Sequence, residues 1–223
     1  MSSVDDSGQL LQKHDCAPPL APEKDTSEEG AGKSSPAESP QTDDEGSVDE
    51  DGVTTLMEAA KRNDVDAVKR YIPYQARMMA RFVKAGRVEI YDGTALMVAA
   101  ALGNVETVKL LMRCEGGMRD SEEWTALMWA ALVGRTEVVR LLLKIEGGMQ
   151  KGRGYTALVL AARHDHLDCV KLLLEKERDI SGVDAIHMAN RWNNSEVASF
   201  LESEGIVDPY LQMQPRKLVS ERA

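Results

Sequence analysis

The sequence predicts an all-α fold, a solenoid of about five helix-turn-helix units with β-hairpin fingers between them. The main observation is a tetrapeptide that returns every 31 residues, as Thr-Ala-Leu-Met at 94–97 and 125–128 and as Thr-Ala-Leu-Val at 156–159. Related tetrapeptides begin at Thr54 and Asp184. A fixed period of this length indicates stacked copies of one supersecondary unit, which bury a continuous core only by packing on one another.

A second observation supports the same register. The position nine residues after the start of each tetrapeptide holds only glycine, asparagine or aspartate, at Asn63, Gly103, Gly134, Asp165 and Asn193. These residue types adopt a positive φ at the lowest steric cost. We therefore expect one left-handed residue between the two helices of every unit.

Each regular unit contains two short helical patterns, as the stretch from Trp124 to Lys144 illustrates. Thr125 precedes the first pattern, and its hydroxyl can accept a hydrogen bond from a free N–H group at the helix start. The second pattern carries a broad apolar face made of Val138, Val139, Leu141, Leu142 and Leu143. Two turns of helix cannot bury such a face alone, so the units must pack side by side.

The chain resembles an ankyrin-repeat protein over residues 51–208. The family pattern Gly-x-Thr-Pro-Leu-His-x-Ala-Ala-x-x-Gly-His-x-x-Val-Val-x-Leu-Leu is matched from Gly154 to Leu174, with alanine in place of the proline and valine in place of the first histidine. The combination of Thr-Ala-Leu-Met with Glu-Gly-Gly-Met is similar to that of a large ankyrin-repeat family of anaerobic protist parasites. The resemblance implies a concave surface that binds proteins. In this register the units lie at about 51–90, 91–121, 122–152, 153–180 and 181–208.

The first 50 residues form a separate acidic segment. They hold five of the eight prolines and 13 acidic against 3 basic side chains, so they carry all of the net charge of −10. A segment of this composition cannot bury enough apolar surface to offset its conformational entropy, and we expect it to be disordered. Its candidate phosphorylation sites are Ser35, Ser39, Thr42 and Ser47. The alternative is a leader that only solvates the protein.

The first two tetrapeptides are 40 residues apart, nine more than the regular period. The extra residues fall within 79–91, where β-forming residues flank Lys84-Ala-Gly-Arg87. This pattern predicts a lengthened β-hairpin finger, with a basic amphipathic helix as the alternative. The helix before the finger is expected to start near Asp66 and to stop at Pro73, because proline cannot continue the helical hydrogen bonds.

The fifth unit is degenerate. Asp184 takes the threonine position, Asn190 takes an alanine position, and the outer side of the unit is polar. The end of a solenoid needs such a polar face, so we expect a C-terminal cap here. A short tail at 209–223 follows it, and the polar first helix of unit one predicts the matching N-terminal cap.

The sequence gives little support for catalysis, metal binding or nucleotide binding. The spacing of His164, His166 and Cys169 could suit zinc, but His166 and Cys169 occupy ordinary repeat positions and no fourth ligand is near. Gly32-Lys33-Ser34 resembles the end of a phosphate-binding loop without the strand and helix that such a loop needs. We therefore expect no enzyme activity, no metal and no cofactor. Outside the acidic segment the chain has 24 acidic and 24 basic side chains, which predicts no nucleic-acid partner.

The residues expected to line the concave surface form the candidate binding site. In the repeat register they lie just before the threonines and at the ends of the first helices. They are Leu102, Trp124, Leu132, Val133, Tyr155, Arg163, His164 and Trp192. We call these eight residues the concave face. Aromatic and arginine side chains are enriched in protein interfaces. The alternative for Leu132 and Val133 is packing between units, which is also the expectation for Trp129.

These features predict a non-enzymatic adaptor that binds a protein partner through the concave face. One alternative is a regulatory subunit of a kinase or another enzyme, although no kinase motif is present. The other is a membrane or cytoskeletal tether that uses the basic finger 77–91, with Arg77, Arg81, Lys84 and Arg87. No apolar run reaches the length of a membrane span and no signal sequence is evident, so we expect a cytoplasmic, monomeric protein.

Overall fold

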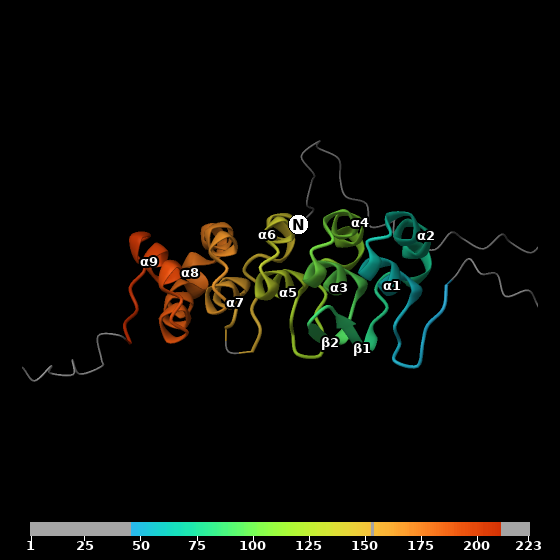
Figure 1. Cartoon of the computed structure of the whole chain (residues 1–223), viewed down its shortest axis with the longest axis horizontal. Helices are drawn as coiled ribbons and strands as arrows, with labels where there is room; N and C mark the ends of the chain where they lie inside the picture. The colour runs from blue at the N-terminus through green and yellow to red at the C-terminus, as the bar shows by residue number, and fades with distance from the viewer. Residues whose placement is uncertain (1–45, 153, 211–223) are drawn as a thin grey trace, which may run out of the picture.

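The computed structural model describes residues 46–152 and 154–210. Its helices form two rows along the long axis of the molecule (Figure 1). One row consists of α1 (Thr55–Arg62), α3 (Ala95–Leu102), α5 (Ala126–Val133) and α7 (Ala157–Arg163). The other consists of α2 (Val65–Gln75), α4 (Val105–Glu115) and α6 (Thr136–Glu146). The array ends with α8 (Leu167–Arg191) and α9 (Ser195–Ser203). The mostly helical solenoid that the sequence predicts is confirmed.

The left-handed residue expected between the helices is present in all five units. The backbone φ is 54° at Asn63, 84° at Gly103 and 75° at Gly134. It is 61° at both Asp165 and Asn193. In units one to three this residue caps the first helix, and its N–H donates to carbonyls of the preceding turn. The prediction of a left-handed residue in every unit is confirmed.

The leucine of each tetrapeptide occupies the same place in successive layers. Leu56, Leu96, Leu127 and Leu158 are at most 1% exposed. Ile186 takes this place in unit five and is fully buried. The first helices contact one another in sequence, α1 with α3, α3 with α5 and α5 with α7. The buried side chains therefore form one continuous core along the array.

A buried carboxylate at or near the end of the second helical segment holds this register in units two to four. Glu115, Glu146 and Glu177 each accept a hydrogen bond from the N–H of the tetrapeptide leucine of their own unit, at 2.7, 2.6 and 2.8 Å. The second carboxylate oxygen accepts from the loop that leads into the unit. The three loop donors are the N–H groups of Arg77, Gly117 and Gly148. Each carboxylate therefore ties a helix start to the finger beside it.

Burial raises the pKa of these three carboxyls, and the hydrogen bonds from backbone N–H groups and a threonine hydroxyl oppose the shift. Unit one uses a neutral amide in the same place. The Gln75 Oε1 atom accepts from the Leu56 N–H at 2.8 Å, and its Nε2 donates to the Ser47 carbonyl at 3.3 Å. The sequence shows a glutamate before each Gly-Gly pair, at Glu115 and Glu146. It does not show that these side chains are buried, because their hydrogen-bond donors include N–H groups of the neighbouring unit.

The long finger is a two-stranded hairpin, as the β pattern predicts. β1 (Ala80–Ala85) pairs antiparallel with β2 (Val88–Gly93). The two-residue turn between them begins at Gly86, whose φ of 63° suits glycine at this position of a hairpin turn. Val83 and Ile90 face each other across the hairpin and are buried. The helical alternative for this segment is wrong.

The other fingers differ from the predicted hairpins. Among the described residues, β1 and β2 are the only strands, and the finger before unit four has a single isolated bridge. In the finger before unit three, the Asp120 carboxylate accepts from the N–H groups of Glu122 and Trp124 at 2.9 and 2.8 Å. Because this side chain takes the donors that a paired strand would offer, the finger is a tight loop without a ladder.

Helix α2 continues past its predicted end at Pro73, and that prediction is wrong. The helix includes Pro73 and ends at Gln75. Proline removes one backbone donor, and the carbonyl that loses it belongs to Lys69, an exposed residue where water can replace the donor. The extra turn brings the Gln75 side chain to the N–H of Leu56. This buried hydrogen bond favours the longer helix.

Units four and five are joined by a helix where the sequence predicts a finger. Helix α8 is 25 residues long and includes Asp184, which therefore does not start a helix. The tetrapeptides of these units are separated by 28 residues, from Thr156 to Asp184, instead of 31. Arg178 and Asp179 stand where units two and three have a Gly-Gly pair. No glycine is therefore available there to end the helix in a left-handed conformation.

The described chain begins with residues that the sequence assigns to the acidic segment. Residues 46–50 lie against unit one, where the Ser47 N–H donates to the Thr55 hydroxyl at 2.8 Å. The other candidate phosphorylation sites, Ser35, Ser39 and Thr42, lie outside the described residues. At the other end, the ring centroid of Tyr210 lies 4.6 Å from that of His187, and residues 211–223 of the C-terminal tail are outside the described part.

Candidate functional site

Trp124 is the first aromatic residue of the concave face, and three side chains contact its ring, one of them Glu122, whose carboxylate accepts from Trp124 Nε1 at 3.3 Å. The ring stacks on Trp129 with ring centroids 4.6 Å apart. The Lys151 Nζ atom lies 4.1 Å from the Trp124 ring centroid and 3.6 Å from the Glu122 carboxylate. A cation over an indole is attracted by the negative face of the ring. Trp124 is therefore half-buried and already covered in part by a lysine of the same chain.

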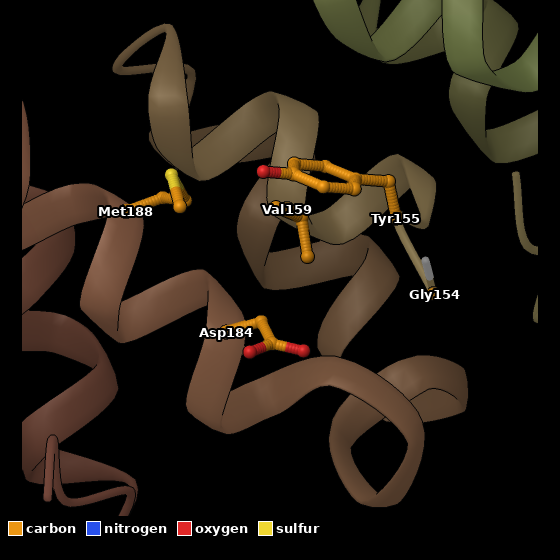
Figure 2. Close-up of a pocket in the computed structure, with 5 residues that line it drawn as sticks. All are labelled: Gly154, Tyr155, Val159, Asp184 and Met188. Atoms are coloured by element: carbon orange, nitrogen blue, oxygen red, sulfur yellow. The ribbon is translucent and has the colours of Figure 1, made fainter. Parts of the chain in front are cut away.

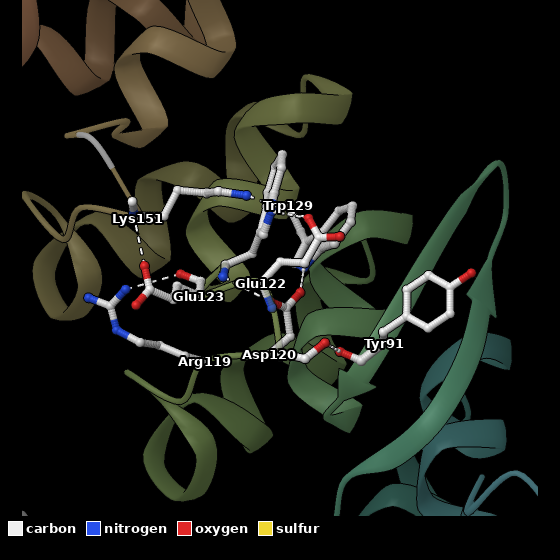
Figure 3. A network of polar contacts seen from close by, with 10 residues as sticks. Tyr91, Arg119, Asp120, Glu122, Glu123, Trp129 and Lys151 are labelled. Carbon is white, nitrogen blue, oxygen red and sulfur yellow. Dashed lines mark hydrogen bonds and ion pairs between the residues drawn. The ribbon is translucent and has the colours of Figure 1, made fainter.

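Asp120 binds the indole of Trp129 (Figure 3) and the backbone of Trp124. Its Oδ2 atom accepts from Trp129 Nε1 at 3.0 Å, and its Oδ1 atom accepts from the Trp124 N–H at 2.8 Å. Burial raises the pKa of the Asp120 carboxyl, and these hydrogen bonds oppose the shift. Trp129 is only 8% exposed, as its repeat position predicts.

Hydrogen bonds join neighbouring fingers into a continuous rim (Figure 3). The Ser121 N–H donates to the Tyr91 carbonyl on β2 at 3.3 Å, which links the hairpin to the next finger. Arg119 Nη1 donates to the Gln150 carbonyl at 2.8 Å, which links that finger to the following one. A rim that is ordered before binding loses less conformational entropy when a partner docks.

A second aromatic cluster lies at the C-terminal end of the concave face. Trp192 is 52% exposed, and the Arg163 guanidinium lies 4.8 Å from its ring centroid. His164 is exposed beside Arg163. Partial burial of its ring lowers the pKa of His164, and the nearby charges of Arg163 and His166 act in the same direction. The cluster thus combines an exposed indole, a cation and an imidazole that is neutral at neutral pH.

The aliphatic members of the concave face are half-buried. Leu102 lies under the hairpin turn, since a Cβ atom at Gly86 would be 3.3 Å from its Cδ2. Leu132 packs on the core, and its carbonyl contacts His166 Nε2 at 3.1 Å. Val133 ends α5 and is also half-buried. Packing between units accounts for the burial of Leu102 and Leu132.

Tyr155 lines a pocket of about 70 Å³ between α7 and α8. The other lining residues are Gly154, Val159, Asp184 and Met188 (Figure 2). Val159 is buried at 1% exposure, while the Asp184 side chain is exposed on α8. The pocket therefore has an aromatic ring, an apolar floor and a carboxylate at its edge.

The side chains whose spacing could suit zinc contact other groups. His166 Nε2 lies against the Leu132 carbonyl, and the Cys169 thiol lies 3.6 Å from the Thr136 hydroxyl. In the part of the chain that the structure describes, no three His, Cys, Asp or Glu side chains gather closely enough to hold a metal ion. Over the same residues, no helix has both the length and the apolarity that crossing a membrane requires.

Two of the four cations of the basic finger lie beside other groups of the chain. Arg77 Nη1 donates to the Cys114 carbonyl at 3.1 Å, so this guanidinium is held against α4. Lys84 stands directly opposite Glu89 across the hairpin. Opposite charges at facing positions attract each other, which leaves Arg81 and Arg87 as the freer cations of the finger. This arrangement weakens the case for a tether through the hairpin.

Comparison with known families identifies the repeats. A model of ankyrin repeats, in three copies, matches residues 39–112, 56–151 and 144–212, which together span most of the chain. The chain belongs to the ankyrin-repeat family. Ankyrin repeats are generally non-enzymatic protein-protein interaction modules, and this ankyrin array shares their architecture. The curated proteins include no match to it.

Several side chains of the ankyrin rim were not identified from the sequence. Asp120 had a usable signal, because an aspartate that precedes a turn often accepts from the N–H groups two and four residues later. No sequence pattern indicated the role of Lys151, because its approach to Trp124 depends on the path of the finger between units three and four. The carboxylate of Glu122 is positioned by the same loop.

Proposed function

We propose that this ankyrin array is a non-enzymatic adaptor that binds a protein partner through the concave face. The observation that carries the proposal is the exposed cluster of Trp192, Arg163 and His164. An indole that is 52% exposed is an unusual surface group in a protein that keeps its other two tryptophans at least half-buried. Tryptophan and arginine are the side chains that most often dominate binding energy in protein interfaces.

The pocket beside Tyr155 favours contact with a partner's side chain over binding of a small substrate, whereas a second pocket, of about 420 Å³, lies between residues 47–55 and the side chains of Glu58 and Arg62. The pocket beside Tyr155 has a volume of about 70 Å³. Sites for small molecules usually enclose roughly 300–1,000 Å³. A solenoid instead offers an extended surface built from several units, which suits a protein partner.

The acidic N-terminal segment has a regulatory role in this proposal. Phosphorylation would add negative charge to a segment that already carries the net charge of the chain. Of the candidate sites, Ser47 lies among the described residues and is exposed, and its hydroxyl lies 3.2 Å from that of Thr55. The regulatory subunit of a kinase is the alternative role, and a kinase assay on the purified chain and on the captured complex separates the two.

Affinity capture with matched variants tests the adaptor proposal. Tyr155→Ala combined with Trp192→Ala removes two aromatic side chains from the concave face. Lys109→Ala combined with Arg140→Ala removes two exposed side chains from the opposite row of helices (Figure 1). We expect the first pair to lose the specifically captured proteins and the second pair to retain them. Equal capture by both pairs would show that partners bind elsewhere.

A further inference from the structure

Unit three shows how the aromatic residue before a tetrapeptide is covered in this array. Trp124 precedes Thr125, and the finger of the next unit lays Lys151 across the indole ring at 4.1 Å. The same ammonium group lies 3.6 Å from Glu122. The ring face and the carboxylate both attract the cation. Within this molecule, an aromatic ring and a neighbouring carboxylate therefore bind a lysine side chain together.

Unit four has the corresponding aromatic residue but lacks a finger to cover it. Tyr155 precedes Thr156 as Trp124 precedes Thr125. A residue equivalent to Lys151 would have to come from a finger between units four and five. That stretch lies inside α8, which is helical throughout its length. The face of Tyr155 toward α8 therefore opens into the pocket (Figure 2).

Helix α8 supplies a carboxylate to this pocket, as Glu122 does beside Trp124, but no lysine. Asp184 is exposed and lines the pocket together with Tyr155. Among the described residues, no lysine, arginine or histidine forms an ion pair with Asp184. Val159 and Met188 add apolar surface that suits the methylene stem of a long side chain. The described residues that line the pocket thus bring an aromatic ring and a carboxylate together, as at Lys151, and they include no lysine, arginine or histidine.

We propose that the pocket beside Tyr155 receives the end of a lysine or arginine side chain from the protein partner. A volume of about 70 Å³ admits one side-chain end and excludes a folded segment. An acidic or phosphorylated side chain would meet the charge of Asp184 and be repelled. This inference rests on the proposed adaptor function and adds to it the chemistry of one contact, a basic residue of the partner.

A titration followed by nuclear magnetic resonance tests the pocket without a known partner. The probes are the Nα-acetyl, N-methylamide derivatives of lysine, arginine and norleucine, the last being an uncharged analogue of lysine. We expect lysine and arginine to shift the amide signals of Tyr155, Val159 and Met188, and norleucine to leave them in place. Asp184→Asn should weaken the binding of lysine about two- to fivefold, as expected for one exposed charge contact.

The matched control is Asp179→Asn, an exposed aspartate of the same helix outside the pocket. It should bind lysine as the wild type does. Tyr155→Leu should weaken binding by a similar factor of about two to five, because it removes the ring face. Equal shifts from norleucine, or unchanged lysine binding in both pocket variants, would overturn the inference. Capture that still depends on the concave face would then leave the adaptor proposal standing.

Discussion

Glu146 illustrates what a single buried charge does in this array. Moving a carboxylate out of water is costly unless hydrogen bonds replace the lost solvation. Its two oxygens accept from the N–H groups of Leu127 at 2.6 Å and Gly117 at 2.9 Å. One donor lies at a helix start and the other in a finger, so the side chain fixes the finger relative to the helices. The position of the concave-face residues depends on this connection.

The raised pKa of Glu146 predicts a pH-dependent stability. Because burial raises this pKa above the ordinary 4.5, the folded chain holds the proton more tightly than the unfolded chain. The resulting stabilisation is fully present below pH 4.5 and is lost as the pH rises through the raised value. We therefore expect the free energy of unfolding of the wild type, minus that of Glu146→Gln, to decrease as the pH increases over this window.

Urea unfolding at a series of pH values measures this difference. The control is Glu137→Gln, which changes an exposed glutamate of the same helix α6. A difference between wild type and Glu146→Gln that stays constant, or grows with pH, would contradict the assignment of a raised pKa.

Backbone conformation could be predicted at single residues, whereas side-chain partners could not. The five left-handed positions follow from residue type, because a positive φ excludes most side chains. The partners of Trp124 do not, since Lys151 reaches it from another unit. The concave-face residues were placed by register alone, and the structure groups Arg163, His164 and Trp192 while it packs Leu102 under the hairpin.

At the scale of the elements, helix α8 is the main departure from the sequence prediction. The tetrapeptide spacing predicts that a finger separates units four and five, yet the chain is helical through this region. Two features of the sequence pointed to the helix. The spacing between the tetrapeptides of units four and five is three residues shorter than the regular period, and the Gly-Gly pair of units two and three is absent there. The long hairpin, in contrast, was predicted correctly because its strands have their own β pattern around Gly86. Local patterns thus predicted elements that do not depend on neighbouring units.

Val183→Pro tests the continuity of α8. Val183 is 47% exposed, so the substitution acts mainly on the backbone. Proline inside a helix removes a hydrogen bond and clashes with the preceding turn, and we expect a loss of about 3 kcal/mol or more in the free energy of unfolding. Val183→Ala is the control and should change stability little. If both variants unfold alike, the chain has a loop here, as the sequence alone predicts.

At the scale of the whole molecule, stability comes from contacts between neighbouring layers. The first helices contact one another in order, and the second helices do so as well, α2 with α4, α4 with α6 and α6 with α8. An array of this kind has no central core that could compensate for a weak layer. The middle unit is therefore the place where a cavity should affect the whole stack.

Leu142→Ala creates such a cavity in α6. Leu142 is fully buried, and shortening it should lower the free energy of unfolding by about 2–5 kcal/mol. Ile145→Ala changes a residue of the same helix that is 44% exposed, and its effect should be clearly smaller. Thermal unfolding followed by circular dichroism measures both. Identical melting of Leu142→Ala and wild type would contradict the stacking register.

The binding claim is tested most directly by photo-crosslinking from the two faces of the array. A photoreactive benzoylphenylalanine replaces the exposed His164 in one protein and the exposed Lys109 in the other, and adducts formed in cell extract are identified by mass spectrometry. We predict a defined protein adduct from position 164 that position 109 does not give. The same adduct in equal yield from both positions, or an adduct from position 109 alone, would contradict binding through the concave face.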